Sequence, residues 1–124
     1  MQLTIKLLFI ASFFMLQKPA PESLANTKWT GTFNVPEAMT GILEFGKDTV
    51  ILYVDNDALE TMLYKQSGDT LTLKKISGGS PCGEETGEYK CGIKDNRLTI
   101  SLLKDECGVR ANAFSAEGYK KEEK

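Results

Sequence analysis

The chain has 124 residues, of which 41% are hydrophobic, and its formal net charge is −2 at neutral pH. This length fits a single domain with an ordinary hydrophobic core. A mildly acidic chain without a basic cluster argues against nucleic acid or an anionic membrane as a partner. The sequence contains no histidine, which excludes Ser-His and Cys-His catalytic systems within this chain. We therefore expect no enzymatic activity and no cofactor.

The first 25 residues have the pattern of a signal peptide. A short start that ends in Lys6 precedes an apolar run from Leu7 to Leu16. A membrane-spanning helix needs roughly 20 apolar residues, so this run is too short to span. Small residues at Ser23 and Ala25 suggest a cleavage point, which we place between residues 17 and 25. We expect an exported protein, periplasmic or secreted, with no membrane attachment after cleavage.

The remaining chain consists of short runs in which hydrophobic and polar residues alternate, the pattern of half-buried strands. Turns such as 46–48, 55–57, 67–69 and 94–96 are rich in Gly, Asp and Asn and short enough to force antiparallel pairing. Closure of sequential antiparallel strands removes exposed edges, so we predict an all-β, eight-stranded antiparallel up-and-down β-barrel. The eight strands are predicted over residues 27–34, 41–45, 49–54, 58–66, 70–76, 86–93, 98–103 and 109–116. The barrel domain would span residues 26–117, followed by a charged C-terminal tail over 118–124.

One face of these strands is apolar and is predicted to form the barrel interior: Val50, Leu52, Val54, Leu71, Leu73, Tyr89, Cys91, Ile93, Leu98, Ile100 and Leu102. The inward face of the strands at 49–54 and 58–66 is ambiguous, because Ile51 and Tyr53, or Met62 and Tyr64, alternate equally well. An eight-stranded barrel is either filled by its own side chains or holds one small ligand. The candidate ligand-binding residues are Tyr53, Tyr64, Leu73, Tyr89, Cys91 and Ile100. Inward tyrosine hydroxyls would orient a mainly apolar ligand.

Three cysteines in an exported chain predict one disulfide and one free thiol. Cys82 and Cys107 both lie beside glycine in turn-like sequence, whereas Cys91 lies on the apolar face of a strand. We favour a bond between Cys82 and Cys107, with Cys82 to Cys91 as the alternative.

Acidic residues in turns carry no metal-binding pattern. Asp55 and Asp57 suggest the start of a calcium loop, but the glycine and distal glutamate of such a loop are misplaced, and a hairpin turn explains them. Asp105 beside Arg110 is predicted to anchor the bend through a charge-assisted hydrogen bond. No metal site is expected.

Several short motifs resemble those of known barrels. Trp29 within Asn26-Thr-Lys-Trp-Thr-Gly31, together with Arg110 near the last predicted strand, resembles the calycin pattern. Gly87-x-Tyr89, Leu98-Thr-Ile100 and Asp105-x-Cys107-x-x-Arg110 are similar to motifs of small exported bacterial lipocalin-like domains. The resemblance implies that Trp29 packs under Arg110 as a structural pair at the closed end of the barrel.

The resemblance also implies a function. A lipocalin-like domain would hold a small apolar ligand in the barrel interior. The alternative is a filled barrel that acts through its rim as a protein-binding module or protease inhibitor, with the long connection at residues 77–85 contacting the partner. In both cases we expect a monomer.

Overall fold

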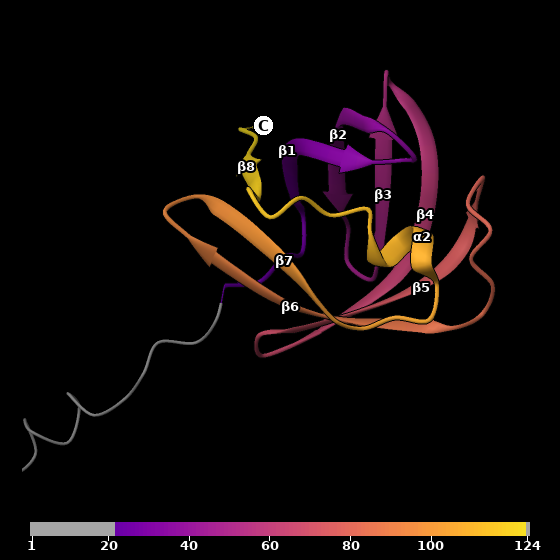
Figure 1. Ribbon diagram of the computed structural model, residues 1–124. Helices are drawn as coiled ribbons and strands as arrows, with labels where there is room; N and C mark the ends of the chain where they lie inside the picture. The colour runs from indigo at the N-terminus through magenta and orange to yellow at the C-terminus, as the bar shows by residue number, and fades with distance from the viewer. Residues whose placement is uncertain (1–21, 124) are drawn as a thin grey trace, which may run out of the picture.

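The computed structural model describes residues 22–123, which form a closed antiparallel β-barrel (Figure 1). The strands pair in sequential order from β1 to β8, and β8 closes the barrel on β1. The predicted up-and-down barrel is therefore confirmed. Its elements are β1 (Thr27–Asn34), β2 (Ala38–Phe45), β3 (Thr49–Val54), β4 (Asp57–Ser67), β5 (Thr70–Gly78), β6 (Thr86–Lys94), β7 (Arg97–Lys104), α2 (Gly108–Ala111) and β8 (Tyr119–Lys121).

The tight hairpins depend on residues that tolerate left-handed backbone. Asp55 and Asn56 between β3 and β4 have φ of 54° and 68°, and Asp95 and Asn96 between β6 and β7 have φ of 53° and 61°. Two consecutive positive φ angles are typical of a type I′ turn, which matches the right-handed twist of the flanking strands. Asp and Asn adopt this conformation more readily than other non-glycine residues. The local sequence thus explains why these strands pair with their neighbours.

The predicted last strand at 109–116 is wrong. This segment forms the short helix α2 and then an isolated bridge between Phe33 and Phe114. The closing strand is β8, which lies in the segment predicted to be a charged tail. Tyr119 explains the choice, because its buried ring stacks on Phe33 at 4.6 Å and its hydroxyl donates to the Thr32 carbonyl at 3.1 Å.

The predicted interior face is largely confirmed. Ten of its members form or pack against the core: Val50, Leu52, Val54, Leu71, Leu73, Tyr89, Cys91, Ile93, Leu98 and Ile100. Leu102 is the exception, with 51% of its surface exposed. β8 pairs with only Arg97 and Leu98 of β7, so the far end of β7 has no neighbouring strand on that side. Leu102 therefore stays exposed, because no strand packs beside this part of β7.

The barrel end opposite α2 is closed by the segment before β1. Leu24 is fully buried, and its backbone N–H donates to Gln66 Oε1 at 2.9 Å. Gln66 Nε2 donates in turn to the Glu22 carbonyl at 2.8 Å. The apolar part of the predicted signal peptide lies outside the described residues. The predicted cleavage window of residues 17–25 therefore contains a residue, Leu24, that belongs to the core.

Candidate ligand-binding cavity

The barrel is not filled at its α2 end. A cavity of about 320 Å³ lies between strands β1 to β4, the connection from β5 to β6, and the segment around α2. Its strand wall is apolar, with Phe33, Leu43, Leu52 and Met62. Val109 and Ala113, from α2 and the turn after it, cover the opposite side. A cavity of this size is at the lower end of the range found for small-molecule sites.

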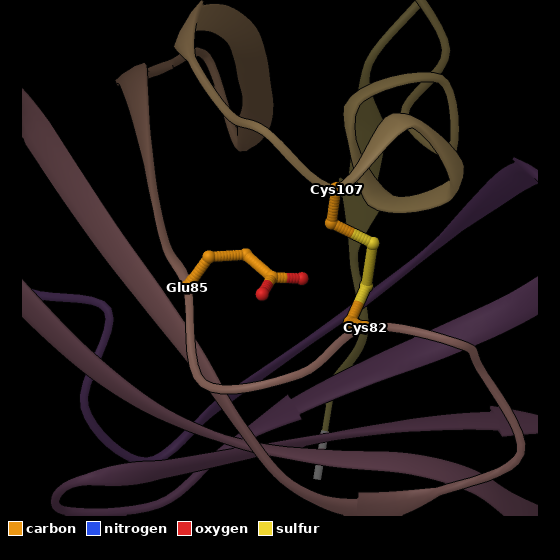
Figure 2. A group of neighbouring side chains, drawn as sticks. All are labelled: Cys82, Glu85 and Cys107. Atoms are coloured by element: carbon orange, nitrogen blue, oxygen red, sulfur yellow. A yellow bond between two sulfur atoms is a disulfide. The ribbon is translucent and has the colours of Figure 1, made fainter.

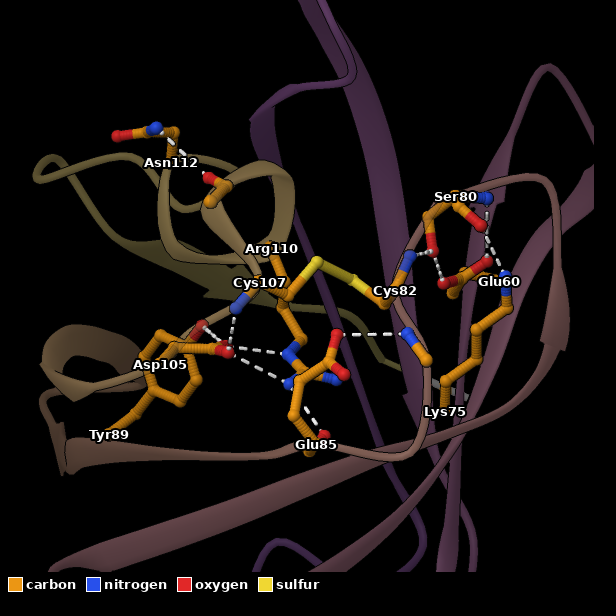
Figure 3. The surroundings of a disulfide bond; sticks show 12 residues. Glu60, Lys75, Ser80, Cys82, Glu85, Tyr89, Asp105, Cys107, Arg110 and Asn112 are labelled. Atoms are coloured by element: carbon orange, nitrogen blue, oxygen red, sulfur yellow. Dashed lines mark hydrogen bonds and ion pairs between the residues drawn. A yellow bond between two sulfur atoms is a disulfide. The ribbon is translucent and has the colours of Figure 1, made fainter.

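Two charged side chains line this apolar cavity, and both are buried. Glu60 is 9% exposed and Arg110 is 5% exposed. Figure 3 shows them on either side of the Cys82–Cys107 disulfide, each within its own set of polar contacts. Buried charges are rare unless they are paired or hydrogen-bonded, and both of these side chains have hydrogen-bond partners.

Glu60 is held by the connection between β5 and β6. Its carboxylate accepts from the Ser80 backbone N–H at 3.3 Å and from the Ser80 hydroxyl. Lys75 Nζ donates to the Ser80 carbonyl, which fixes the same loop. The close approach needs Gly78, because a Cβ at that position would overlap the Glu60 carboxylate. In the described chain, Glu60 takes part in no ion pair.

Arg110 is fixed by a fork of hydrogen bonds. Its Nε donates to Asp105 Oδ2 at 2.6 Å and its Nη2 to Asp105 Oδ1 at 2.8 Å. Nη2 also donates to the Glu85 carbonyl at 2.9 Å. The Tyr89 hydroxyl and the Cys107 backbone N–H donate to the same carboxylate (Figure 3). The predicted bond between Asp105 and Arg110 is therefore confirmed, and it joins β6, the bend after β7, and α2.

This network changes the pKa values of its members. Burial by itself would raise the pKa of Asp105, but the hydrogen bonds from Arg110, Tyr89 and the Cys107 backbone hold it below its ordinary value. Burial, followed by the bond to Asp105, raises the pKa of Tyr89 well above its ordinary value. The hydrogen bond to Asp105 raises the pKa of Arg110 despite the opposing effect of burial. At neutral pH the network thus consists of an ionised Asp105 paired with a protonated Arg110, and of a neutral Tyr89 hydroxyl.

One donor of the network has no acceptor. Arg110 Nη1 is buried and makes no hydrogen bond to any residue in the range 22–123. Leaving a buried donor unpaired costs about 1–3 kcal/mol, so such atoms are uncommon in native proteins. The side chain that carries this donor lines the cavity. The cavity wall therefore combines apolar residues with the buried carboxylate of Glu60 and part of the Arg110 side chain.

The disulfide joins Cys82 to Cys107, as predicted, and Cys91 is the free, buried thiol. It fixes the connection between β5 and β6 to the residue that precedes α2. Figure 2 shows the Glu85 carboxylate beside this bond, with ligand-type atoms of all three residues within 4.8 Å of one another. Metals bind the thiolate form of cysteine, so the bonded sulfurs do not provide a metal site. Glu85 Oε1 instead accepts from the Gly83 N–H at 2.8 Å.

The structure separates the predicted ligand-binding residues from this cavity. Leu73, Tyr89, Cys91 and Ile100 are buried in the core, but none of them lines the cavity. Tyr64 stacks edge-on against Phe45 at 5.0 Å and donates to the Gly46 carbonyl at 2.6 Å, near the closed end. Tyr53 was a candidate in a strand whose inward face the sequence left ambiguous; it lies on the outer face, because Leu52 and Val54 take the inner positions of β3. It lines a second pocket, of about 490 Å³, on the outer face of β1 to β3, with Lys28 and Glu44.

The predicted pair of Trp29 and Arg110 is not formed. The cation over the Trp29 ring is Lys121 Nζ, 5.9 Å from the ring centroid, and the indole N–H donates to Thr27 Oγ1 at 2.8 Å. Arg110 belongs to α2 and turns toward Asp105. The physical reason is the misplaced last strand: β8, and not the segment at 109–116, runs beside Trp29.

Sequence reasoning missed Glu60 and, in the apolar wall of the cavity, Phe33 and Leu43. It placed Leu52 in the barrel interior but did not assign it to a ligand site. A signal for Glu60 was present, because it shares the alternating face of Met62 in β4 and is the one charged residue on that face. The alternation did not decide which face of β4 points inward, because Leu59 and Leu63 on the other face are also apolar. Arg110 was recognised as important, but only the position of α2 places it at the cavity.

The fold and cavity define an all-antiparallel closed barrel that is compatible with a calycin-like binding scaffold. Comparisons with protein-family models, curated proteins and solved structures found no match to this chain. Across residues 22–123, no helix is long and apolar enough to cross a membrane. The disulfide is consistent with an oxidising compartment, as the export prediction requires.

Proposed function

We propose that this protein binds one small, mainly apolar ligand in the cavity at the α2 end of its barrel. The observation that supports this most directly is the cavity itself, whose wall is apolar apart from a few buried polar groups. Such a combination is characteristic of small-molecule sites, in which burial provides affinity and polar groups orient the ligand. The role is binding and not catalysis, and the protein is exported and carries its ligand as a monomer.

The volume limits the size of the ligand. One water molecule occupies about 30 Å³ of liquid, so the cavity of about 320 Å³ holds roughly ten groups of that size. A nine-methylene chain would gain about 7 kcal/mol at about 0.8 kcal/mol for each buried methylene. That free energy corresponds to a Kd on the order of 10 μM before the costs of association. Binding assays should therefore start at micromolar ligand and extend to higher concentrations, because the costs of association weaken binding.

The first test is a titration with the fluorescent dye N-phenylnaphthylamine, an apolar probe, on protein purified without refolding. Ala113→Leu places a larger side chain in the cavity and reduces its free volume, whereas Ala111→Leu makes the same change at a residue that does not line the cavity. We expect Ala113→Leu to weaken dye binding at least about tenfold, since overpacking costs about 1–3 kcal/mol. Ala111→Leu should bind as the wild type does. Equal binding by both variants would place the dye elsewhere and contradict the proposal.

The alternative, a protein-binding rim, predicts a different pattern. The connection at 79–85 has an exposed Pro81 and is fixed by the disulfide, so it would offer a stable contact surface. Native and denaturing mass spectrometry of the purified protein separates the two functions. A native mass above the denatured mass shows a co-purified small molecule and supports ligand binding. Equal masses, together with no dye binding, would contradict it and favour the rim.

A further inference from the structure

Glu60 brings a carboxylate to the strand wall of the cavity. It lies opposite Leu52 in the pairing of β3 with β4, and it precedes Met62 by two positions in β4. Paired residues of neighbouring strands, and residues two apart in one strand, point to the same face of a sheet. Leu52 and Met62 are buried and line the cavity. The Glu60 side chain, which is also buried and lines the cavity, therefore enters the barrel interior from the same wall.

The charge of Glu60 has no ion-pair partner within residues 22–123. Its carboxylate accepts hydrogen bonds from the Ser80 N–H and hydroxyl, and neither of these donors is charged. Lys75 contacts the same loop residue, but its Nζ donates to the Ser80 carbonyl and forms no ion pair with Glu60 (Figure 3). Arg110, the basic residue in the described wall of the cavity, is paired with Asp105. The wall therefore carries one negative charge without a direct ion pair.

A carboxylate at this position has unused capacity to bind a ligand. An ionised carboxylate can accept about four hydrogen bonds, and Ser80 supplies two to Glu60. A buried charge is costly unless it is paired, whereas an apolar side chain at an inner position of β4 would avoid that cost. A cation in the cavity would provide the missing pair. Hydrogen bonds between ionised groups are also about twice as strong as those between neutral groups.

We infer that the ligand is an amphipathic amine, whose protonated nitrogen donates to the Glu60 carboxylate and whose hydrocarbon part contacts the apolar wall of the cavity. An alkylamine is protonated at neutral pH, as the lysine side chain is. The apolar wall, which includes Phe33 and Leu43, provides most of the affinity, and Glu60 selects the head group. This inference rests on the proposed function, and it adds the chemical class of the ligand.

Three probes with the same nine-carbon chain test the head group: nonylamine, 1-nonanol and nonanoate. Each is titrated at neutral pH against wild-type protein with bound N-phenylnaphthylamine, and its affinity is measured from the displacement of the dye. We expect nonylamine to bind at least about tenfold more tightly than nonanol, because a close charge pair that is shielded from water contributes strongly to binding. Nonanoate should bind more weakly than nonanol, since two neighbouring carboxylates repel each other.

The variant Glu60→Gln tests whether this carboxylate is the origin of the preference. Glutamine keeps the shape of the side chain and an acceptor for Ser80, but it removes the charge. Nonylamine should lose at least about tenfold in affinity, whereas nonanol should bind as it does to the wild type. Glu44→Gln is the matched control, since it removes one negative charge from the outer face, where Glu44 pairs with Lys28. Its preferences should equal those of the wild type.

The outcomes separate the ligand class from the proposed function. If the dye does not bind to the wild-type protein at all, the proposed function fails. If the dye binds but nonanol or nonanoate displaces it as well as nonylamine does, the proposed function stands and the amine is wrong. If nonylamine keeps its full preference in Glu60→Gln, another group attracts the cation and the role of Glu60 is overturned. Should Glu60→Gln not fold, the three probes on the wild-type protein still decide the head group.

Discussion

Asp105 is the residue on which three separate segments depend. Its buried carboxylate accepts from Tyr89 in β6, from the backbone of Cys107 and from Arg110 in α2. Removal of one partner of a buried ion pair leaves the other charge without compensation, which typically costs about 3–5 kcal/mol. The network is therefore a structural requirement for the position of α2, and through α2 for the shape of the cavity.

Asp105→Asn should destabilise the protein at neutral pH by about 3–5 kcal/mol, measured by chemical denaturation. The matched control is Glu106→Gln, a change at the exposed neighbouring residue, which should have an effect of less than about 0.5 kcal/mol. If both variants are equally stable, the network does not hold the fold together.

The pH dependence of stability should also change in Asp105→Asn. The pKa of Asp105 is lowered in the folded state, so below its ordinary value the unfolded chain takes up a proton that the folded chain does not. The wild type therefore loses this stabilisation as the pH falls through about 4 and below. Melting temperatures between about pH 5 and pH 3 should fall more steeply for the wild type than for Asp105→Asn. Parallel curves would show that Asp105 is not the group responsible.

Gly87 shows how closely β6 approaches this network. A Cβ at Gly87 would overlap the Asp105 carboxylate, whereas a Cβ at Gly92 in the same strand would make only an ordinary contact, 3.7 Å from Thr99 Oγ1. Gly87→Ala should therefore destabilise the protein by about 1–3 kcal/mol through overpacking. Gly92→Ala should be neutral or slightly stabilising, because alanine loses less conformational entropy on folding. Equal melting temperatures for the two variants would contradict the close approach.

Among the elements, the connection between β5 and β6 is the one that depends most on a covalent bond. The disulfide closes a loop with a sequence separation of 25 and ties this connection to α2. The chain-entropy model assigns such a loop about 3 kcal/mol of stabilisation. Because Cys82 lines the cavity, the same bond also fixes one side of its wall.

Reduction of the wild-type protein should lower its melting temperature and weaken dye binding. The variant with Cys82→Ser and Cys107→Ser should show the lower stability, by about 3 kcal/mol, and no further response to reductant. Cys91→Ala keeps the disulfide and should respond to reductant as the wild type does. A response to reductant in the double serine variant would mean that Cys91 is the sensitive group.

At the scale of the whole molecule, closure of the barrel depends on a three-residue strand. β8 pairs with Trp29 and Thr30 on one side and with Arg97 and Leu98 on the other. Without it, β1 and β7 would present unpaired edges, which other chains readily extend. The segment from α2 to Phe114 covers the rest of this gap, through the bridge between Phe33 and Phe114.

Deletion of residues 119–124 should therefore open the barrel and promote association. The loss of the buried Tyr119 alone is expected to cost about 3–5 kcal/mol, as for other large aromatic residues. Size-exclusion chromatography with light scattering should show oligomers or aggregates. Deletion of residues 123–124 is the control and should leave a stable monomer. A monomeric and stable chain without residues 119–124 would show that β8 is dispensable for closure.

Much of the architecture follows from local patterns in the sequence. Alternation of apolar and polar residues predicted the bounds of β1 and β3 as they are observed, and Asp-Asn turns predicted which strands pair. The pairing of Cys82 with Cys107 was also predictable, because turn residues differ in composition from residues on a buried face. These features depend on neighbours in the chain, so one sequence contains the information.

The closing strand and the cavity were decided by tertiary packing. The last strand contains Tyr119, whose ring stacks on Phe33 inside the barrel. This contact forms only when the barrel closes and β8 pairs with β1, so it could not be read from neighbouring residues in the sequence. The same choice removes Arg110 from Trp29 and directs it to Asp105, which leaves Nη1 buried without a hydrogen-bond partner in the described chain. Alternation specifies which side chains point inward, but it does not specify which end of the barrel interior is filled by side chains and which end keeps a cavity. The position of the cavity depends on how the two barrel ends are closed, by Leu24 at one end and by α2 at the other.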